Sequence, residues 1–138
     1  MKSLIIPMYA MVLLTFLVAL RLLWVRATAI KTGIVKMSYF RSLSDAPPSD
    51  TMAIPARHFV NLFEVPVLFY AACIVALVIG DQSEFLVKCA WGFVACRIAQ
   101  ATIHLTYNNV RHRMVAYFLG FFIVLAMWTS LVCTELQK

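Results

Sequence analysis

Three polar side chains that could hold a charged ligand lie at helical spacing near the middle of the sequence. Arg57, Asn61 and Glu64 are separated by four and three residues, so one face of a helix would carry all three. His58 lies in the same segment and could equally be an interfacial residue without a role. The planar guanidinium group of an arginine suits carboxylates in particular. The spacing therefore predicts a polar helix face that could bind an anion.

A second polar face occurs farther along the chain. Arg97, His104 and Arg111 follow one another in two steps of seven residues, and each step is nearly two helical turns. Positions between them complete the same stripe: Gln100, Ala101 and Asn108. We therefore expect a second helix whose polar face could meet the first.

These charges would lie inside apolar segments, where a charge is costly. An arginine near the centre of a membrane span costs about 2.5–3.5 kcal/mol on insertion scales. Arg97 lies close to the midpoint of residues 85–107, and Glu64 would lie at a similar depth in an antiparallel neighbour. We therefore expect Glu64 and Arg97 to pair. The other groups should follow toward the cytoplasmic end, with Asn61 and His104 one turn nearer and Arg57 and Arg111 at the mouth.

One carboxylate would face a surplus of arginines in this region: Glu64 against Arg57, Arg97, Arg111 and Arg113. Because one carboxylate can neutralise one arginine, the remaining positive charge in a half-dry groove favours an anionic ligand. The same polar groups could instead hold the helices together, at about 0.6 kcal/mol per contact. The two roles do not exclude each other.

The composition indicates which elements position these groups. The 138 residues are 63% hydrophobic and 13% charged, whereas ordinary soluble domains have roughly 25% charged residues. A soluble domain of this length could not bury so much apolar surface. This excludes a soluble globular enzyme, a disordered chain and a disulfide scaffold. We therefore expect an all-α membrane protein.

Four apolar segments are long enough to cross a bilayer, which takes about 20 residues of helix. They are residues 4–25, 57–80, 85–107 and 114–133. Because they lack the two-residue alternation of a barrel, they predict a bundle of four transmembrane helices. We expect residues 1–138 to form a single domain.

The loop charges indicate an orientation. The net charge is +6, and basic residues gather in the segments 26–56 and 108–113, whereas the turn 81–84 is acidic. The positive-inside rule places both basic segments in the cytoplasm and both termini on the other side. The arginines form no soluble basic face, so we expect no nucleic-acid partner. The four cysteines lack metal-binding spacing, and we expect no metal site.

Two segments carry a family resemblance. The sequence RHFVNLFEVP at residues 57–66 resembles the R-x3-N-x2-E signature of the second helix in the MAPEG family, the membrane-associated proteins in eicosanoid and glutathione metabolism. The sequence RIAQATIHLTYNNVRHR at residues 97–113 resembles that family's third helix and following loop. Length, span number and topology agree along essentially the whole chain. The resemblance implies a homotrimer of four-helix subunits, and a small bacterial-type member in the inner membrane.

The resemblance also implies site residues, because glutathione binds between neighbouring subunits of that family near the cytoplasmic side. Six residues would contact it: Arg26, Arg57, Asn61, Glu64, Arg97 and His104. The arginine that assists the glutathione sulfur would be Arg111 or Arg113, and both fit its spacing. His104 stands where characterised enzymes commonly have a tyrosine.

The function implied is that of a glutathione-dependent transferase or peroxidase, acting on lipophilic electrophiles that enter from the lipid. A thiol with a pKa of about 8.5 is mostly protonated at neutral pH, and a neighbouring arginine favours the nucleophilic thiolate. The alternative is a non-catalytic member that binds a lipid or an anionic metabolite. A transporter subunit is a third interpretation, which the expected lack of broken helices disfavours.

Overall fold

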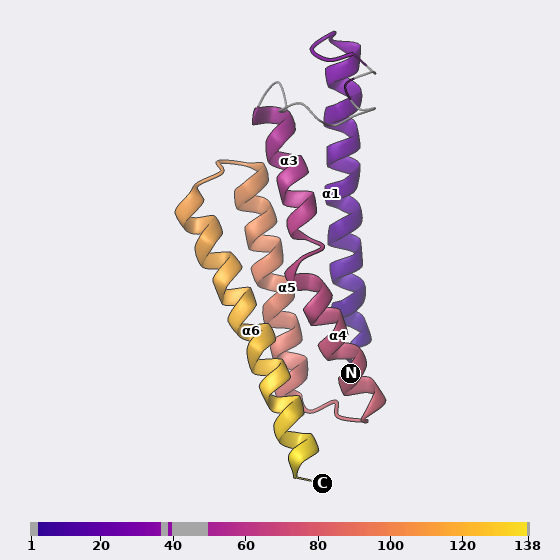
Figure 1. Ribbon diagram of the computed structural model, residues 1–138, viewed down its shortest axis with the longest axis vertical. Helices are drawn as coiled ribbons and strands as arrows, with labels where there is room; N and C mark the ends of the chain where they lie inside the picture. Colours follow the sequence, from indigo (N-terminus) through magenta and orange to yellow (C-terminus); the bar gives the residue numbers. More distant parts are fainter. Residues whose placement is uncertain (1–2, 37–38, 40–49, 138) are drawn as a thin grey trace.

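The computed structural model describes residues 3–36, 39 and 50–137 and consists of long helices. In chain order these are α1 (Ile5–Lys31), α3 (Asp50–Asn61), α4 (Val65–Val78), α5 (Glu84–Leu105) and α6 (Val110–Leu136). They form an elongated bundle in which successive spans run in opposite directions (Figure 1). The expectation of an all-helical chain is confirmed.

Four stretches of helix are long and apolar enough to cross a membrane. They are Ile5–Lys31, Met52–Val78, Glu84–Leu105 and Val110–Leu136. Large apolar side chains project outward from them, such as Phe16, Val78 and Phe122, each at least 60% exposed. A surface of this kind suits lipid or neighbouring subunits rather than water. The expectation of four spans is therefore confirmed.

The two ends of the bundle are distinct. Both termini and the turn between α4 and α5 lie at one end, and we call the half of the bundle near them the terminal half (Figure 1). The end of α1, the start of α3 and the connection between α5 and α6 lie at the other end, and we call that half the loop half. The predicted polar faces of α3 and α5 fall in the loop half.

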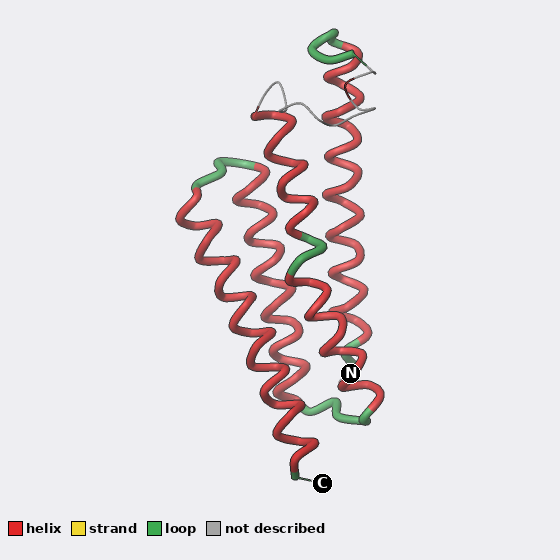
Figure 2. Tube along the Cα trace, viewed as in Figure 1, coloured by secondary structure: helices red, strands yellow, loops and turns green. Residues whose placement is uncertain are grey.

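The second span is interrupted between α3 and α4 (Figure 2). Pro66 lies in the first turn of α4 and cannot donate a backbone N–H to the carbonyl of Leu62. Leu62 itself donates its N–H to the carbonyl of Phe59, three residues back, as in a tighter turn. Glu64 becomes the N-cap residue of α4 with a φ of −89° and a ψ of −91°. The expectation of unbroken helices is therefore wrong for this span.

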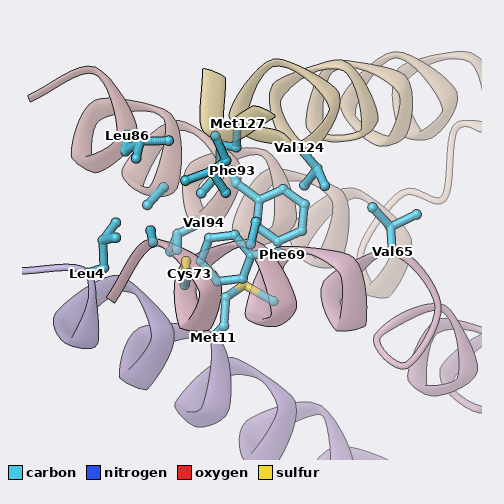
Figure 3. Packing of buried hydrophobic residues seen from close by; sticks show 14 of the residues in the cluster. Leu4, Met11, Val65, Phe69, Cys73, Leu86, Phe93, Val94, Val124 and Met127 are labelled. Carbon is cyan, nitrogen blue, oxygen red and sulfur yellow. The ribbon is translucent and has the colours of Figure 1, made fainter. Parts of the chain in front are cut away.

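The terminal half contains an apolar core. The rings of Phe69 in α4 and Phe93 in α5 stack with their centroids 4.5 Å apart. Both rings are buried, as are Met11 of α1 and Met127 of α6 (Figure 3). The indole N–H of Trp128 donates to the carbonyl of Leu68 over 3.2 Å, which ties α6 to α4. This half holds the four spans together by packing.

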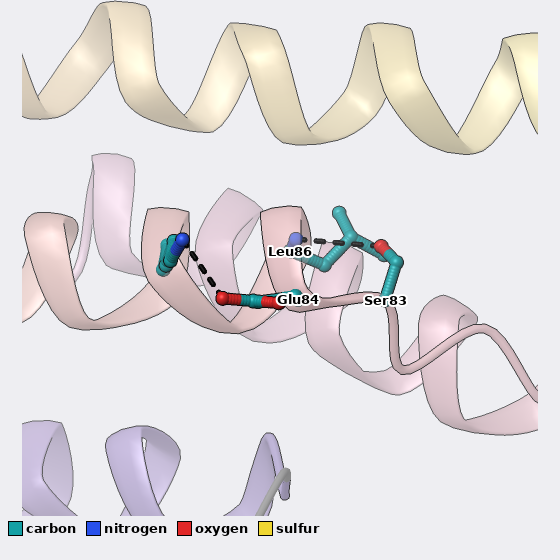
Figure 4. Close-up of polar contacts among 4 residues, drawn as sticks. Ser83, Glu84 and Leu86 are labelled. Carbon is teal, nitrogen blue, oxygen red and sulfur yellow. Dashed lines mark hydrogen bonds and ion pairs between the residues drawn. The ribbon is translucent and has the colours of Figure 1, made fainter.

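Local capping sets the start of α5. The hydroxyl oxygen of Ser83 accepts a hydrogen bond from the backbone N–H of Leu86, over 3.4 Å (Figure 4). Glu84 in the first turn forms an ion pair with Lys88, over 2.8 Å. The hydroxyl of Thr134 near the end of α6 donates to the carboxylate of Asp81 in the preceding turn, over 3.2 Å. These contacts fix the register of α5, and hence the depth of its polar residues.

Candidate ligand-binding site

The loop half buries polar side chains where the terminal half buries apolar ones. His58 of α3 and Arg97 of α5 are completely buried, and Gln100 and His104 of α5 are 2% exposed. The polar face of α5 therefore turns inward, toward α3 and α6, as its spacing predicts. On α3 the fully buried polar residue is His58, whereas Asn61 is only half-buried.

Arg97 is held by an amide and two aromatic rings. Its Nη1 donates to Oε1 of Gln100 over 2.6 Å. Its Cζ lies 4.9 Å from the ring centre of Phe93 and 5.2 Å from that of Tyr117, within the range of cation–π attraction. Its Nε and Nη2 are buried and have no hydrogen-bond partner among the described residues. The guanidinium group thus has only part of its hydrogen-bonding capacity satisfied.

The expectation of an ion pair between Glu64 and Arg97 is wrong for the described chain. Glu64 is exposed, and Arg97 hydrogen-bonds to Gln100 instead. The physical reason is Pro66, which breaks the helix and takes Glu64 off the face that carries Arg57 and Asn61. The carboxylate still attracts Arg97 electrostatically, but it does not bond to it.

A pocket opens in the loop half beside His104. Its volume is about 470 Å³, and it is lined by Ala56, Arg57, Val60 and Asn61 of α3, His104 of α5 and Arg113 of α6. Nη1 of Arg113 donates to Oδ1 of Asn108 over 2.9 Å and lies 3.4 Å from Nε2 of His104. The pocket thus gathers two guanidinium groups, an amide and an imidazole. The structure thus brings Arg57, Asn61 and His104 of the expected site residues to one pocket.

The turn between α5 and α6 decides which arginine faces this pocket. Asn108 adopts a left-handed conformation with a φ of 46°, which asparagine tolerates. The side chain of Asn109 then caps α6 by accepting from the backbone N–H groups of Arg111 and His112. Arg111 therefore belongs to α6 and does not continue the polar face of α5, contrary to expectation.

The two arginines of that turn have different surroundings. Arg113 is half-buried and lines the pocket. Arg111 is exposed and lies beside an apolar groove formed with Met114, Val115, Phe118, Leu119 and Phe122. Within one subunit, the structure brings Arg113 to the pocket and leaves Arg111 outside it.

The remaining expected site residues lie away from the pocket lining. Glu64 occupies the N-cap position of α4 at the helix break, and its side chain makes no capping hydrogen bond. Arg97 lies seven residues before His104 on α5, which is about 10 Å deeper in the bundle. Arg26 is half-buried near the end of α1. None of the three is among the described residues that line the pocket.

His58 is completely buried, whereas its residue type is equally compatible with an interfacial position without a role. A periodic signal was present, because His58 precedes Leu62, Val65 and Phe69 at spacings of four, three and four residues. Those three apolar residues are all buried. His58 therefore continues the buried face of the span, and its position predicts burial better than its residue type does.

A comparison with protein families supplies independent information. The model of the MAPEG family matches residues 4–133, which is almost the entire chain. No match was found among curated proteins or among solved structures. Together with the four spanning helices, the family match shows that the chain is a multi-pass membrane protein and that it belongs to the MAPEG family.

Proposed function

We propose that the protein binds glutathione in the pocket of the loop half and uses it as a transferase or peroxidase on lipophilic electrophiles. The observation that carries this proposal is the set of side chains around the pocket: Arg57, Asn61, His104 and Arg113. No carboxylate is among the described residues that line it. A pocket with two guanidinium groups and no acidic neighbour favours an anionic ligand.

The pocket suits the tripeptide in charge and size. Glutathione carries two carboxylates and an ionisable thiol, and Arg57 and Arg113 supply two guanidinium groups on different helices for these anionic groups. The amide of Asn61 can donate to a further oxygen. The volume of about 470 Å³ falls within the roughly 300–1,000 Å³ of small-molecule sites.

Arg113 is the residue we assign to the glutathione sulfur. A guanidinium group beside a thiol favours the thiolate through charge and hydrogen bonding. In conjugation, the thiolate would form a carbon–sulfur bond to the electrophile, and the leaving group would depart with its electron pair. Arg113 lines the pocket, whereas Arg111 does not. This supports Arg113 for the role that spacing alone left open.

The lipophilic substrate would reach the sulfur from the membrane side. The groove beside Arg111 has a volume of about 430 Å³ and is lined by apolar residues of α6. These include Met114 and Phe118, which lie close along the chain to Arg113. We assign this groove to the lipophilic substrate because both sites start at the loop end of α6.

We further propose a homotrimer with the glutathione site at a subunit boundary, on the cytoplasmic side of a bacterial inner membrane. Family membership and the extensive exposed apolar surface support an assembly. Glu64 is exposed, so a neighbouring subunit could bring its Glu64 to a bound ligand. The basic residues of the loop half support the orientation, because positive charge favours the cytoplasmic side.

Calorimetric titration of the purified protein with glutathione tests the binding site. We expect wild-type protein to bind, Arg113→Ala to lose about tenfold or more in affinity, and Arg111→Ala to lose much less. The two arginines are two residues apart, so each variant is the matched control of the other. Failure of the wild-type protein to bind at millimolar glutathione would contradict the proposal.

A second candidate function is a non-catalytic member that binds a lipid or an anionic metabolite. The observations that favour it are His104 in place of the usual tyrosine and the position of Glu64 outside the pocket. Turnover of 1-chloro-2,4-dinitrobenzene separates the two candidates. Conjugation above the uncatalysed rate, lost in Arg113→Ala, rejects the non-catalytic role, whereas binding without turnover supports it.

The broken second span also bears on a transport role. Transporters often use broken helices at their binding sites, and the span between α3 and α4 is broken at Glu64. The expected lack of broken helices therefore no longer argues against a transporter. The pocket, however, lies among α3, α5 and α6 and is lined by no residue of the break.

A further inference from the structure

Two imidazole rings are in contact behind the pocket. The ring centres of His58 in α3 and His104 in α5 lie 4.7 Å apart, with their planes inclined at 55°. His58 is completely buried, and His104 reaches the pocket while being only 2% exposed. The pair therefore connects the ligand pocket to the interior of the bundle.

The nitrogen atoms of this region are poorly satisfied. Six buried side-chain nitrogens have no hydrogen-bond partner among the described residues. One is Nη1 of Arg21 in α1, and the other five belong to this region: Nδ1 and Nε2 of His58, Nδ1 of His104, and Nε and Nη2 of Arg97. Each such atom costs about 1–3 kcal/mol when left unsatisfied. A cost of this size in one small region indicates that the region is built for something besides stability.

Arg113 determines the protonation state of His104 in this arrangement. A guanidinium group can only donate hydrogen bonds, so Nε2 of His104, 3.4 Å from Nη1 of Arg113, must be the acceptor. The proton of the neutral imidazole is then on Nδ1, which points away from Arg113. A proton on Nε2 of His104 would therefore displace this contact with Arg113.

Positive groups of three helices act on the pair. Arg57 of α3, Arg97 of α5 and Arg113 of α6 all act electrostatically on one or both rings. The fourth helix, α1, carries Arg21, whose guanidinium lies over the ring of Trp24. A further positive charge on the imidazoles is unfavourable in these surroundings. A negative charge in the pocket would offset this repulsion.

We propose that the pocket takes up its anionic ligand together with one proton, which the His58–His104 pair holds. The inference rests on the proposed function, because the anion is glutathione. A carboxylate or thiolate in the pocket would attract the guanidinium of Arg113 and release the lone pair on Nε2 of His104. That lone pair then forms an N–H bond with a proton taken from solvent or from the glutathione thiol. His58 acts through His104 as a positioning residue and shares the added charge.

Calorimetry in buffers of different ionisation enthalpy measures this proton directly. The probe is S-methylglutathione, which carries both carboxylates but no thiol, so any exchanged proton belongs to the protein. The slope of observed enthalpy against buffer ionisation enthalpy gives the number of protons taken up. We expect uptake of up to about one proton per bound ligand near neutral pH. If the wild-type protein binds the probe without taking up protons, this inference is wrong and the proposed function is unaffected.

Variants locate the proton. His58→Gln should bind the probe with reduced uptake, because His104 would then carry the added charge without a neighbouring imidazole ring to share it. His112→Gln is the matched control, since His112 is exposed and its Nδ1 lies 3.0 Å from the hydroxyl of Tyr107, outside the pocket. His104→Gln provides a second test if His58→Gln fails to fold. If a folded His58→Gln or His104→Gln variant takes up as many protons as the wild-type protein, that histidine has no part in holding the proton.

The experiment separates this inference from the proposed function. If neither glutathione nor S-methylglutathione binds the wild-type protein, the proposed function fails, and this inference fails with it. If both bind without proton exchange, the proposed function stands and only the proton-holding pair is wrong. If both bind and the uptake depends on His58, both proposals are supported.

Discussion

The terminal half and the loop half of the bundle are built from the same spans but use their interiors differently. In the terminal half, the stacked rings of Phe69 and Phe93 fill the centre, and Trp128 and Thr134 have hydrogen-bond partners. In the loop half, His58, Arg97 and His104 are buried with nitrogens that lack partners among the described residues. One half therefore stabilises the fold, whereas the other gives up stability for a charged site.

The largest effect should come from the stacked rings of the terminal half. Replacing Phe93 by alanine removes a buried ring and should destabilise the protein by about 3 kcal/mol, near the low end for buried phenylalanine because lipid weakens the hydrophobic term. Unfolding of the protein in detergent micelles measures the change. The control is Phe122→Ala at an exposed position, and similar losses for both would show that the terminal half is not the stabilising one.

Replacing the buried arginine of the loop half should increase the stability of the protein, not lower it. Arg97→Met should raise stability by about 1 kcal/mol or more, because a buried charge without an ion-pair partner is replaced by an apolar group of similar length. Gln100→Leu in addition removes the amide that would lose its partner. The same unfolding assay applies. A loss of stability in the double variant would mean that Arg97 is a structural residue.

Removing one hydrogen bond of the terminal half should destabilise the protein moderately. Trp128→Phe keeps an aromatic ring but removes the indole N–H that donates to the carbonyl of Leu68. The expected destabilisation is about 1 kcal/mol, typical for one hydrogen bond. Glutathione affinity should stay within about twofold of wild type, because the site is in the other half. A large loss of affinity would indicate that the halves are coupled.

The smallest loss of stability should come from removing the N-terminal cap of α5. Ser83→Ala removes the hydroxyl that accepts from the backbone N–H of Leu86. The expected destabilisation is about 0.5–1 kcal/mol. Ser83→Asp serves as the control, because aspartate can also cap a helix and should restore the stability. If Ser83→Asp is no more stable than the alanine variant, the cap does not set the start of α5.

The sequence predicts the spans well because hydropathy reports burial in lipid directly. Helical spacing and antiparallel neighbours also predict that Asn61 and His104 lie at a similar depth, and the structure brings both to one pocket. The prediction fails at Glu64, because the effect of Pro66 on the helix outweighs the periodicity of the polar residues.

Local turn chemistry and packing explain why the positions of Arg111 and His58 differ from those that the sequence suggests. The Asn108–Asn109 turn ends one helix and starts the next, so Arg111 leaves the face of α5 and Arg113 reaches the pocket. His58 has the residue type of an interfacial group but occupies a buried position of the span. In each case a backbone conformation or a packing position, rather than composition, determines the outcome.

A structure of the protein with bound glutathione tests most directly whether the loop half is the ligand-binding half. The account predicts that a carboxylate of the tripeptide lies within hydrogen-bond distance of the guanidinium group of Arg57 and that the sulfur lies beside Arg113, with His104 beside the ligand. Glutathione bound elsewhere, or held by Arg111 with Arg113 still bonded to Asn108, would contradict it.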